Sequence, residues 1–172
     1  MKIFLKFLHF AVLIVCLIIQ IVFGDYLKLY FINFDLIMLV VAAVAVFDGV
    51  IYGVAYGFVG GMLFDLLTAN IIGVSALIYA VNAFIISRII DLGFRLKIIT
   101  YILIIFFITE INLLFISGVY YLFNFSLNVK QFGLEMIINP VCNIILMFII
   151  FPVISAGKEK KEEFGFIYKN KA

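Results

Sequence analysis

The feature that most constrains this chain is the separation of its charges from its apolar residues. Charged residues make up 13% of the 172 and gather at the N-terminus, near 25–35, around 88–97, at 130 and after 157. Long, almost uncharged runs lie between them, and 67% of the chain is hydrophobic, whereas a soluble domain is about half apolar. Too few polar residues remain to cover a water-exposed surface. The pattern therefore predicts an all-α integral membrane protein.

The apolar runs predict a bundle of six transmembrane helices. The expected spans are 3–23, 34–47, 51–67, 73–90, 98–122 and 134–154, which makes residues 1–156 one membrane domain and 157–172 a cytoplasmic tail. Two of the spans are shorter than the roughly 20 residues that cross a bilayer. With both ends inside, only Lys28 and Lys130 of the 12 basic residues lie outside, as the positive-inside rule requires. We expect a multi-pass protein of the bacterial inner (plasma) membrane with both termini in the cytoplasm.

The third span carries a stripe of glycine. Gly53, Gly57 and Gly61 lie four residues apart and therefore share one helix face. Helices in lipid associate through close van der Waals contact, which glycine permits by letting backbones approach. Each interior glycine costs about 1 kcal/mol relative to alanine, so the stripe predicts a helix packed against it.

Asp65 continues the glycine stripe into the outer part of the third span, where a carboxylate in lipid costs up to about 3 kcal/mol. We expect it to accept hydrogen bonds from Ser75, Tyr79 or the first N–H groups of the fourth span, where the helix dipole favours negative charge. Gly73 lets the chain turn into that span. Asp65 then holds the turn together. The alternative is that the stripe and Asp65 form a groove in which another membrane protein docks.

Glu110 is the other unusual carboxylate, near the middle of the fifth span. An ionisable residue inside a membrane is by default a candidate functional residue. It either holds helices together through hydrogen bonds, takes part in a ligand or proton site, or contacts a partner. The candidate hydrogen-bond partners are Asn82, Asn139 and Asn143. In the ligand interpretation, Glu110 lines an outward pocket together with Asn112, Asn139 and Asn143, as in a transporter subunit.

No pattern in the sequence supports an enzyme, a metal, a cofactor or nucleic acid as a partner. His9 is the only histidine, and we expect it to be an interfacial residue near the inner end of the first span. One histidine cannot complete a metal cluster or a Ser/His/Asp set. The glycines of 53–61 lack the strand and lysine of a phosphate-binding loop. Cys16 and Cys142 fall inside apolar runs, so we expect small core residues rather than a disulfide.

The stretch GFVGGMLFDLLTANIIGVSALIYAVNAFIISRI, residues 57–89, resembles the signature of the rod shape-determining MreD family. That family has a glycine-rich helix ending in an aspartate and leucines, then a turn with a glycine, then a helix leading to a basic loop. The matching residues here are Gly57, Gly61, Asp65, Leu66, Leu67, Gly73 and Arg88. A second stretch, FDLIMLVVAAVAVFDG at 34–49, is similar to the family's second helix. Asp35 and Leu36 match it, and Phe34 stands where the family commonly has proline.

The resemblance implies a non-enzymatic scaffold subunit of the bacterial cell-elongation machinery. Such a subunit holds MreC, a single-span protein, near the actin-like protein MreB and the peptidoglycan synthases. The resemblance also implies a fold similar to the substrate-binding subunits of energy-coupling-factor vitamin transporters, and such a subunit is the alternative function. Those subunits often carry an alanine-xxx-alanine face on the first helix, but here Ala11 is followed by Val15. Membrane lipid is a further expected partner, and a homodimer is a candidate assembly.

Overall fold

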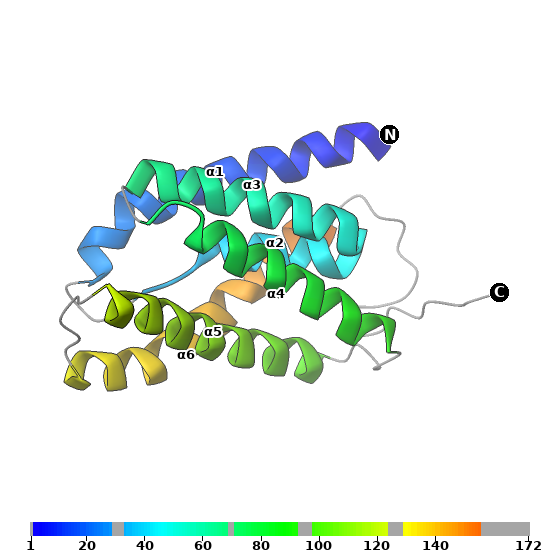
Figure 1. Cartoon of the computed structure of the whole chain (residues 1–172). Helices are drawn as coiled ribbons and strands as arrows, with labels where there is room; N and C mark the ends of the chain where they lie inside the picture. The colour runs from blue at the N-terminus through cyan, green and yellow to red at the C-terminus, as the bar shows by residue number, and fades with distance from the viewer. Residues whose placement is uncertain (1, 29–32, 69–70, 93–97, 124–128, 156–172) are drawn as a thin grey trace.

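Six helices make up the described part of the chain, and no strand occurs there (Figure 1). The computed structural model describes residues 2–28, 33–68, 71–92, 98–123 and 129–155. The tail expected at 157–172 lies outside these residues. In chain order the helices are α1 (Lys2–Lys28), α2 (Leu36–Asp48), α3 (Val50–Thr68), α4 (Val74–Asp91), α5 (Ile98–Leu122) and α6 (Val129–Ser155).

Five of these helices, α1 and α3 to α6, are long and apolar enough to cross a membrane. The helix α2 has only 13 residues. At 1.5 Å per residue it is about 20 Å long, short of the roughly 30 Å of hydrocarbon in a bilayer. The structure thus has five long apolar helices and one short one, and the short one corresponds to the span predicted at 34–47.

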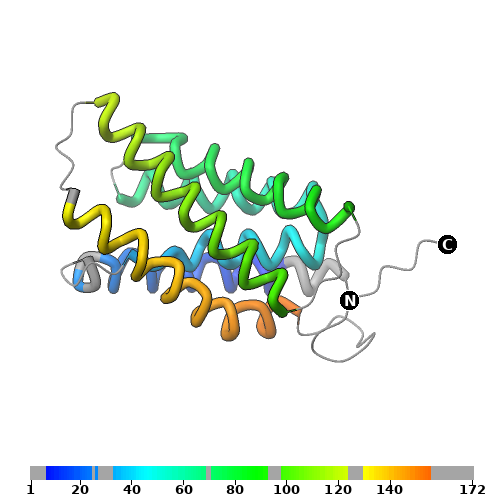
Figure 2. Tube along the Cα trace, turned by 90° about the horizontal axis from the view of Figure 1, so that it is seen from below, coloured from blue at the N-terminus to red at the C-terminus, as the bar shows by residue number. Residues whose placement is uncertain are grey.

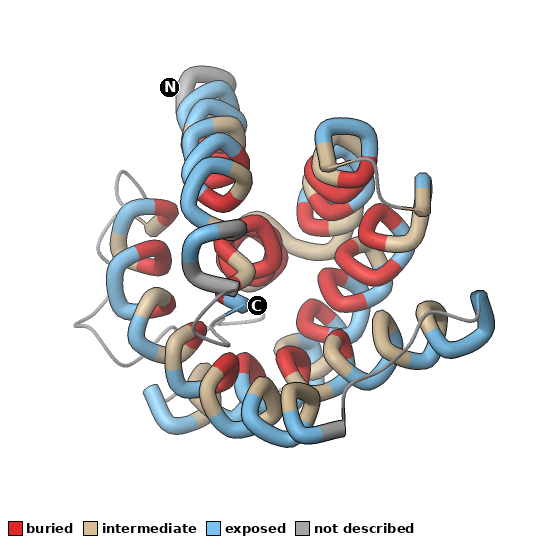
Figure 3. Tube along the Cα trace, turned by 90° about the vertical axis from the view of Figure 1, so that its left-hand side faces the viewer, coloured by how far each residue is buried: buried red, intermediate tan, exposed pale blue. Residues whose placement is uncertain are grey.

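The short helix α2 lies in the middle of the bundle. Ten of its 13 residues are buried, from Leu36 to Ala45, and it packs against α1, α3, α4 and α6. Figure 3 shows these buried residues at the centre, with the exposed faces of the other helices turned outward. A helix that is apolar on all sides belongs in a core. Because its neighbours cover α2, it does not need the length of a helix that meets lipid.

The helices run alternately back and forth, so α1 begins and α6 ends at the same end of the bundle (Figures 1 and 2). We call this end the His9 end. We call the opposite end, where α2, α4 and α6 begin, the Asp35 end. Among the long helices, α3 and α4 pack together most extensively, whereas α5 packs mainly on α6 and touches α4 only slightly. The bundle is thus tight on the α3–α4 side and looser between α4 and α5.

Candidate functional site

The buried face of α3 consists only of glycines and one aspartate: Gly53, Gly57, Gly60, Gly61 and Asp65. A Cβ atom added at Gly57 would lie 2.7 Å from the carbonyl carbon and oxygen of Tyr79. One added at Gly61 would lie 2.5 Å from Cα of Ala76. The backbones of α3 and α4 are therefore in direct contact, as small residues permit in helix pairs.

The glycine stripe of α3 also contacts α2 and α1. A Cβ atom at Gly53 would lie 2.7 Å from Cβ of Ala45, at the far end of α2. At Gly60 it would meet methyl groups of Leu13 and Ile37 at 3.1 Å. The sequence analysis missed Gly60 because it followed only the spacing of four, although a spacing of three also keeps residues on one helix face. Helices of this chain fill the whole stripe, so the alternative of an open docking groove for another protein does not fit.

Asp65 joins the end of α3 to the start of α4. It is fully buried, and its Oδ2 accepts hydrogen bonds from the backbone N–H groups of Gly73 at 2.9 Å and Ser75 at 3.0 Å. The first N–H groups of a helix lack intrahelical partners, and its dipole favours a negative charge there. The predicted hydrogen bond to the first N–H groups of the fourth span is present. Gly73 has φ +95°, a left-handed conformation that favours glycine.

The side chain of Asp35 caps α2. Its Oδ1 accepts from the N–H of Met38 at 3.0 Å, and the hydroxyl of Tyr79 donates to both carboxylate oxygens at 2.9 Å. Gln20 of α1 donates to Oδ1 at 3.4 Å and accepts from the N–H of Ile37 at 3.0 Å. The first N–H groups of a helix lack intrahelical partners, and inside a membrane they need partners from the protein. Side chains from α1 and α4 thus complete its first turn, and Tyr79, expected as a partner of Asp65, serves Asp35 instead.

Two asparagines of α6 satisfy the extended backbone that precedes α2. Asn139 accepts from the N–H of Asn33 at 2.8 Å, and Asn143 accepts from the N–H of Asp35 at 3.0 Å. The amide of Asn143 also donates to the hydroxyl of Thr109 at 3.2 Å. The two asparagines lie one helical turn apart on one face of α6. Irregular backbone at membrane depth is tolerated only where it is buried in protein or lines a water-filled cavity, and these side chains pair two of its N–H groups.

Glu110 is not brought together with the asparagines expected as its partners. Asn82 donates to Asn112 at 2.6 Å, while Asn139 and Asn143 bond to the backbone before α2. Glu110 is half-buried, and its Oε1 has no hydrogen-bond partner among the described residues. The asparagine pair instead joins α4 to α5, two helices that otherwise touch only slightly.

A cavity of about 400 Å³ opens among the helices at the Asp35 end. Three of the four residues predicted to line an outward pocket do so, namely Asn112, Asn139 and Asn143, whereas Glu110 does not. Asp35, Asp65 and the α6 residue Glu135 also line it. The lining therefore combines three carboxylates with amides and apolar side chains. It contains no Lys, Arg or His among the described residues.

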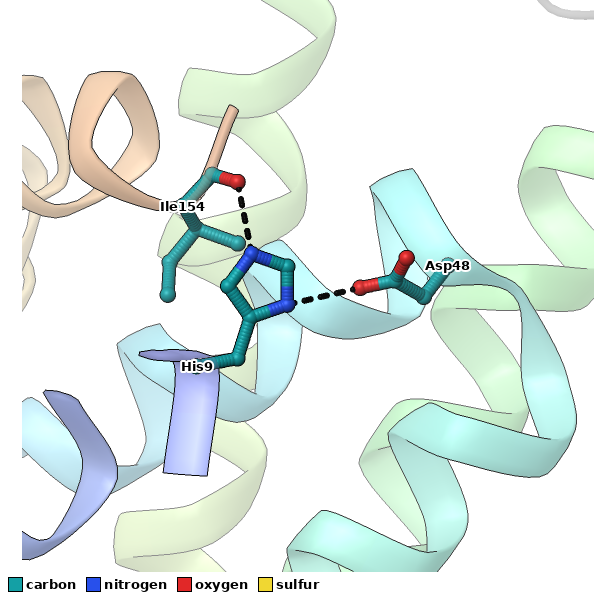
Figure 4. Close-up of polar contacts among 3 residues, drawn as sticks. All are labelled: His9, Asp48 and Ile154. Carbon is teal, nitrogen blue, oxygen red and sulfur yellow. Dashed lines mark hydrogen bonds and ion pairs between the residues drawn. The ribbon is translucent and has the colours of Figure 1, made fainter. Parts of the chain in front are cut away.

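His9 ties three helices together at the other end (Figure 4). Its Nδ1 lies 3.0 Å from Oδ2 of Asp48, at the end of α2, and its Nε2 lies 3.0 Å from the backbone oxygen of Ile154, near the end of α6. The last carbonyl groups of a helix lack intrahelical donors, so the ring caps α6. His9 is 1% exposed, so its side chain faces the neighbouring helices rather than lipid or water.

Sequence spacing gave no signal for this contact, because its three residues lie far apart in the chain. A histidine in an apolar run could have been paired with the aspartate that ends the second span, since both were predicted at the same membrane face. Such a pairing adds a polar link between helices that lie next to each other.

Comparison with known proteins gives one result. No curated protein and no solved structure matches this chain. A family model described as rod shape-determining protein MreD matches residues 1–155. The match covers all six helices and both polar ends of the bundle. The chain therefore belongs to the MreD family of rod shape-determining proteins.

Proposed function

We propose that this protein is a membrane scaffold of the rod-shape complex that binds a single-span, MreC-like protein. Through that partner it would link the MreB cytoskeleton to peptidoglycan synthesis. The family match over residues 1–155 carries the proposal, because that family acts in rod-shape determination. A binding role without chemistry agrees with the polar groups described above, since most of them join helices of this chain.

The partner would bind on the outer, lipid-facing surface of the bundle. The glycine stripe of α3 is covered by α2 and α4, so it offers no face to a second protein. Large apolar side chains remain exposed on α1 and α5, among them Phe7, Phe23, Phe107 and Phe115. In lipid such faces associate with a partner helix through shape and van der Waals contact.

We also propose that the His9 end faces the cytoplasm of a bacterium and that the membrane is the inner one. Ten of the 12 basic residues then lie inside. Fusions of a cytoplasmic fluorescent reporter and of a periplasmic phosphatase to the C-terminus test this orientation. Fluorescence without phosphatase activity is the expected result, and the reverse would overturn it.

Affinity purification in mild detergent from the native host, followed by mass spectrometry, tests the scaffold role. Recovery of a single-span protein with a periplasmic domain, together with cell-wall synthases, is expected. An unrelated multi-pass protein carrying the same tag serves as the control. Failure to enrich such a protein over that control would contradict the proposal.

The alternative function is a substrate-binding subunit of a transporter, with the expected likeness to energy-coupling-factor subunits. The cavity lined by Asn112, Asn139 and Asn143 is the observation that favours it. In the same purification, a second multi-pass subunit with paired cytoplasmic ATPases would support this alternative over the scaffold.

A further inference from the structure

We propose that the cavity at the Asp35 end binds a small organic cation: an ammonium group on an apolar body that also carries one hydrogen-bond acceptor. The proposal concerns this cavity alone and does not depend on the scaffold role. The cavity has a volume of about 400 Å³, which falls within the roughly 300–1,000 Å³ of small-molecule sites in proteins.

Two buried polar atoms of the lining residues have no hydrogen-bond partner among the described residues. One is Oδ1 of Asp65, a residue that is 0% exposed, and the other is Nδ2 of Asn112, a residue that is 5% exposed. The second oxygen of Asp65 and the carbonyl oxygen of Asn112 are both engaged by this chain. Buried polar groups are rarely left unpaired, because each costs about 1–3 kcal/mol. Both residues line the cavity, so we take these two atoms as the acceptor and the donor that the ligand would engage.

The carboxylates of the cavity lining favour a ligand with a positive charge. Asp35, Asp65 and Glu135 contribute carboxylates, and the described lining has no basic side chain. Met38 and the tyrosine hydroxyl of Tyr79 already donate to Asp35, whereas Asp65 keeps a free oxygen. An ammonium group would donate to that oxygen as a charge-assisted hydrogen bond, which is stronger than a neutral one. An anion would meet three carboxylates and no basic side chain of the described lining, so it should bind more weakly than a cation.

Apolar and aromatic side chains would hold the body of the ligand. Phe64, Leu113, Ile116 and Phe132 line the same cavity. Ring faces near a cation add attraction through the ring quadrupole. An aromatic amine with a hydroxyl group has all the required parts: a cation, an apolar body and an acceptor for Asn112.

The chain has no tryptophan, which permits a direct binding assay with an indole probe. We would titrate the full-length protein in phosphatidylglycerol nanodiscs against 5-hydroxytryptamine and follow its fluorescence anisotropy with excitation beyond the tyrosine band. The matched probes are 5-hydroxytryptophol, which is neutral, and 5-hydroxyindole-3-acetate, which is an anion. Saturable binding of the amine, at least about tenfold tighter than either analogue, is expected for one charge-assisted hydrogen bond.

Variants connect the binding to the cavity. Asp65→Asn leaves one acceptor oxygen for the N–H groups of the turn and places an NH2 group where the free carboxylate oxygen was. It should therefore weaken amine binding by about tenfold or more. Glu135→Gln keeps the acceptor for Gln131, which donates to Glu135 at 2.8 Å, and should weaken binding less. Glu110→Gln removes one carboxylate outside the cavity lining and should leave the affinity unchanged.

The ammonium group could belong to a free solute or to the headgroup of phosphatidylethanolamine. Adding that lipid to the nanodiscs separates these sources. A fall in the affinity for 5-hydroxytryptamine would assign the site to the headgroup, and an unchanged affinity would assign it to a solute. Equal partition of all three indoles, or no saturable binding of the amine, would overturn the proposal and leave a cavity that holds only water.

Discussion

The α3–α4 pair and the helix α6 join the bundle in two different ways. The backbones of α3 and α4 touch through Gly57 and Gly61, with no side chain between them. In contrast, side-chain hydrogen bonds of Asn139 and Asn143 join α6 to the backbone segment just before α2, and His9 joins α6 to α1. Both are known modes of helix association in lipid. The first mode fails when volume is added, and the second fails when a donor or acceptor is lost.

The largest expected effect comes from adding volume to the glycine contact. Gly57→Leu or Gly61→Leu should lower the free energy of unfolding by about 3 kcal/mol or more, because the new side chain would clash with the backbone of α4. Titration with SDS, followed by circular dichroism, measures this loss. Gly118→Leu is the matched control, since no atom lies within 4 Å of a Cβ built there. Equal loss in the control would show that the loss does not come from the contact with α4, since leucine by itself favours a helix over glycine.

Asp65 lies where the glycine contact meets the turn between α3 and α4. Asp65→Leu leaves the N–H groups of Gly73 and Ser75 unpaired and should cost about 2–3 kcal/mol. Asp65→Asn keeps an acceptor and should cost about 1 kcal/mol. The same SDS titration compares the two variants. If both lose the same stability, the charge of the carboxylate matters rather than its capacity to accept hydrogen bonds.

The polar mode is tested at Asn143. Asn143→Leu removes the acceptor of the Asp35 N–H and the donor to Thr109, and should cost about 1–2 kcal/mol. Val141→Leu places the same residue on the lipid-facing side of α6, where the side chain is half exposed, and should be neutral. Unchanged stability of Asn143→Leu would mean that apolar packing alone holds α6 on α2.

The smallest of the four effects is expected at His9. His9→Phe keeps an aromatic ring, slightly larger than imidazole, but removes both polar contacts, and should cost about 1 kcal/mol. Leu8→Phe changes the exposed neighbour and serves as the control. Melting in detergent, followed by size-exclusion chromatography, is sensitive enough to rank the two. If His9→Phe and the control have the same melting temperature, the hydrogen bonds of His9 do not stabilise the packing of α6 on α1 and α2.

Hydrophobic runs and glycine spacing determined much of this protein from the sequence alone. They predicted an all-helical membrane protein, a helix packed on the stripe of Gly53, Gly57 and Gly61, and hydrogen bonds from Asp65 to the start of the next helix. Local sequence could carry these predictions because each depends on residues close in the chain. The spacing of four places the glycines on one face, and Asp65 lies eight residues before Gly73.

Only the tertiary structure decided which polar groups meet. Asp35 and Tyr79 are 44 residues apart, Asn33 and Asn139 are 106 apart, and His9 and Ile154 are 145 apart. The hydropathy pattern indicates that such groups need hydrogen-bond partners inside the membrane. It does not identify the partners, because any helix of the bundle could supply them. Likewise, the short length of α2 became intelligible only when four helices were found to cover it. The sequence thus determines that a polar group inside the membrane must be satisfied, and the packing of the helices determines by what.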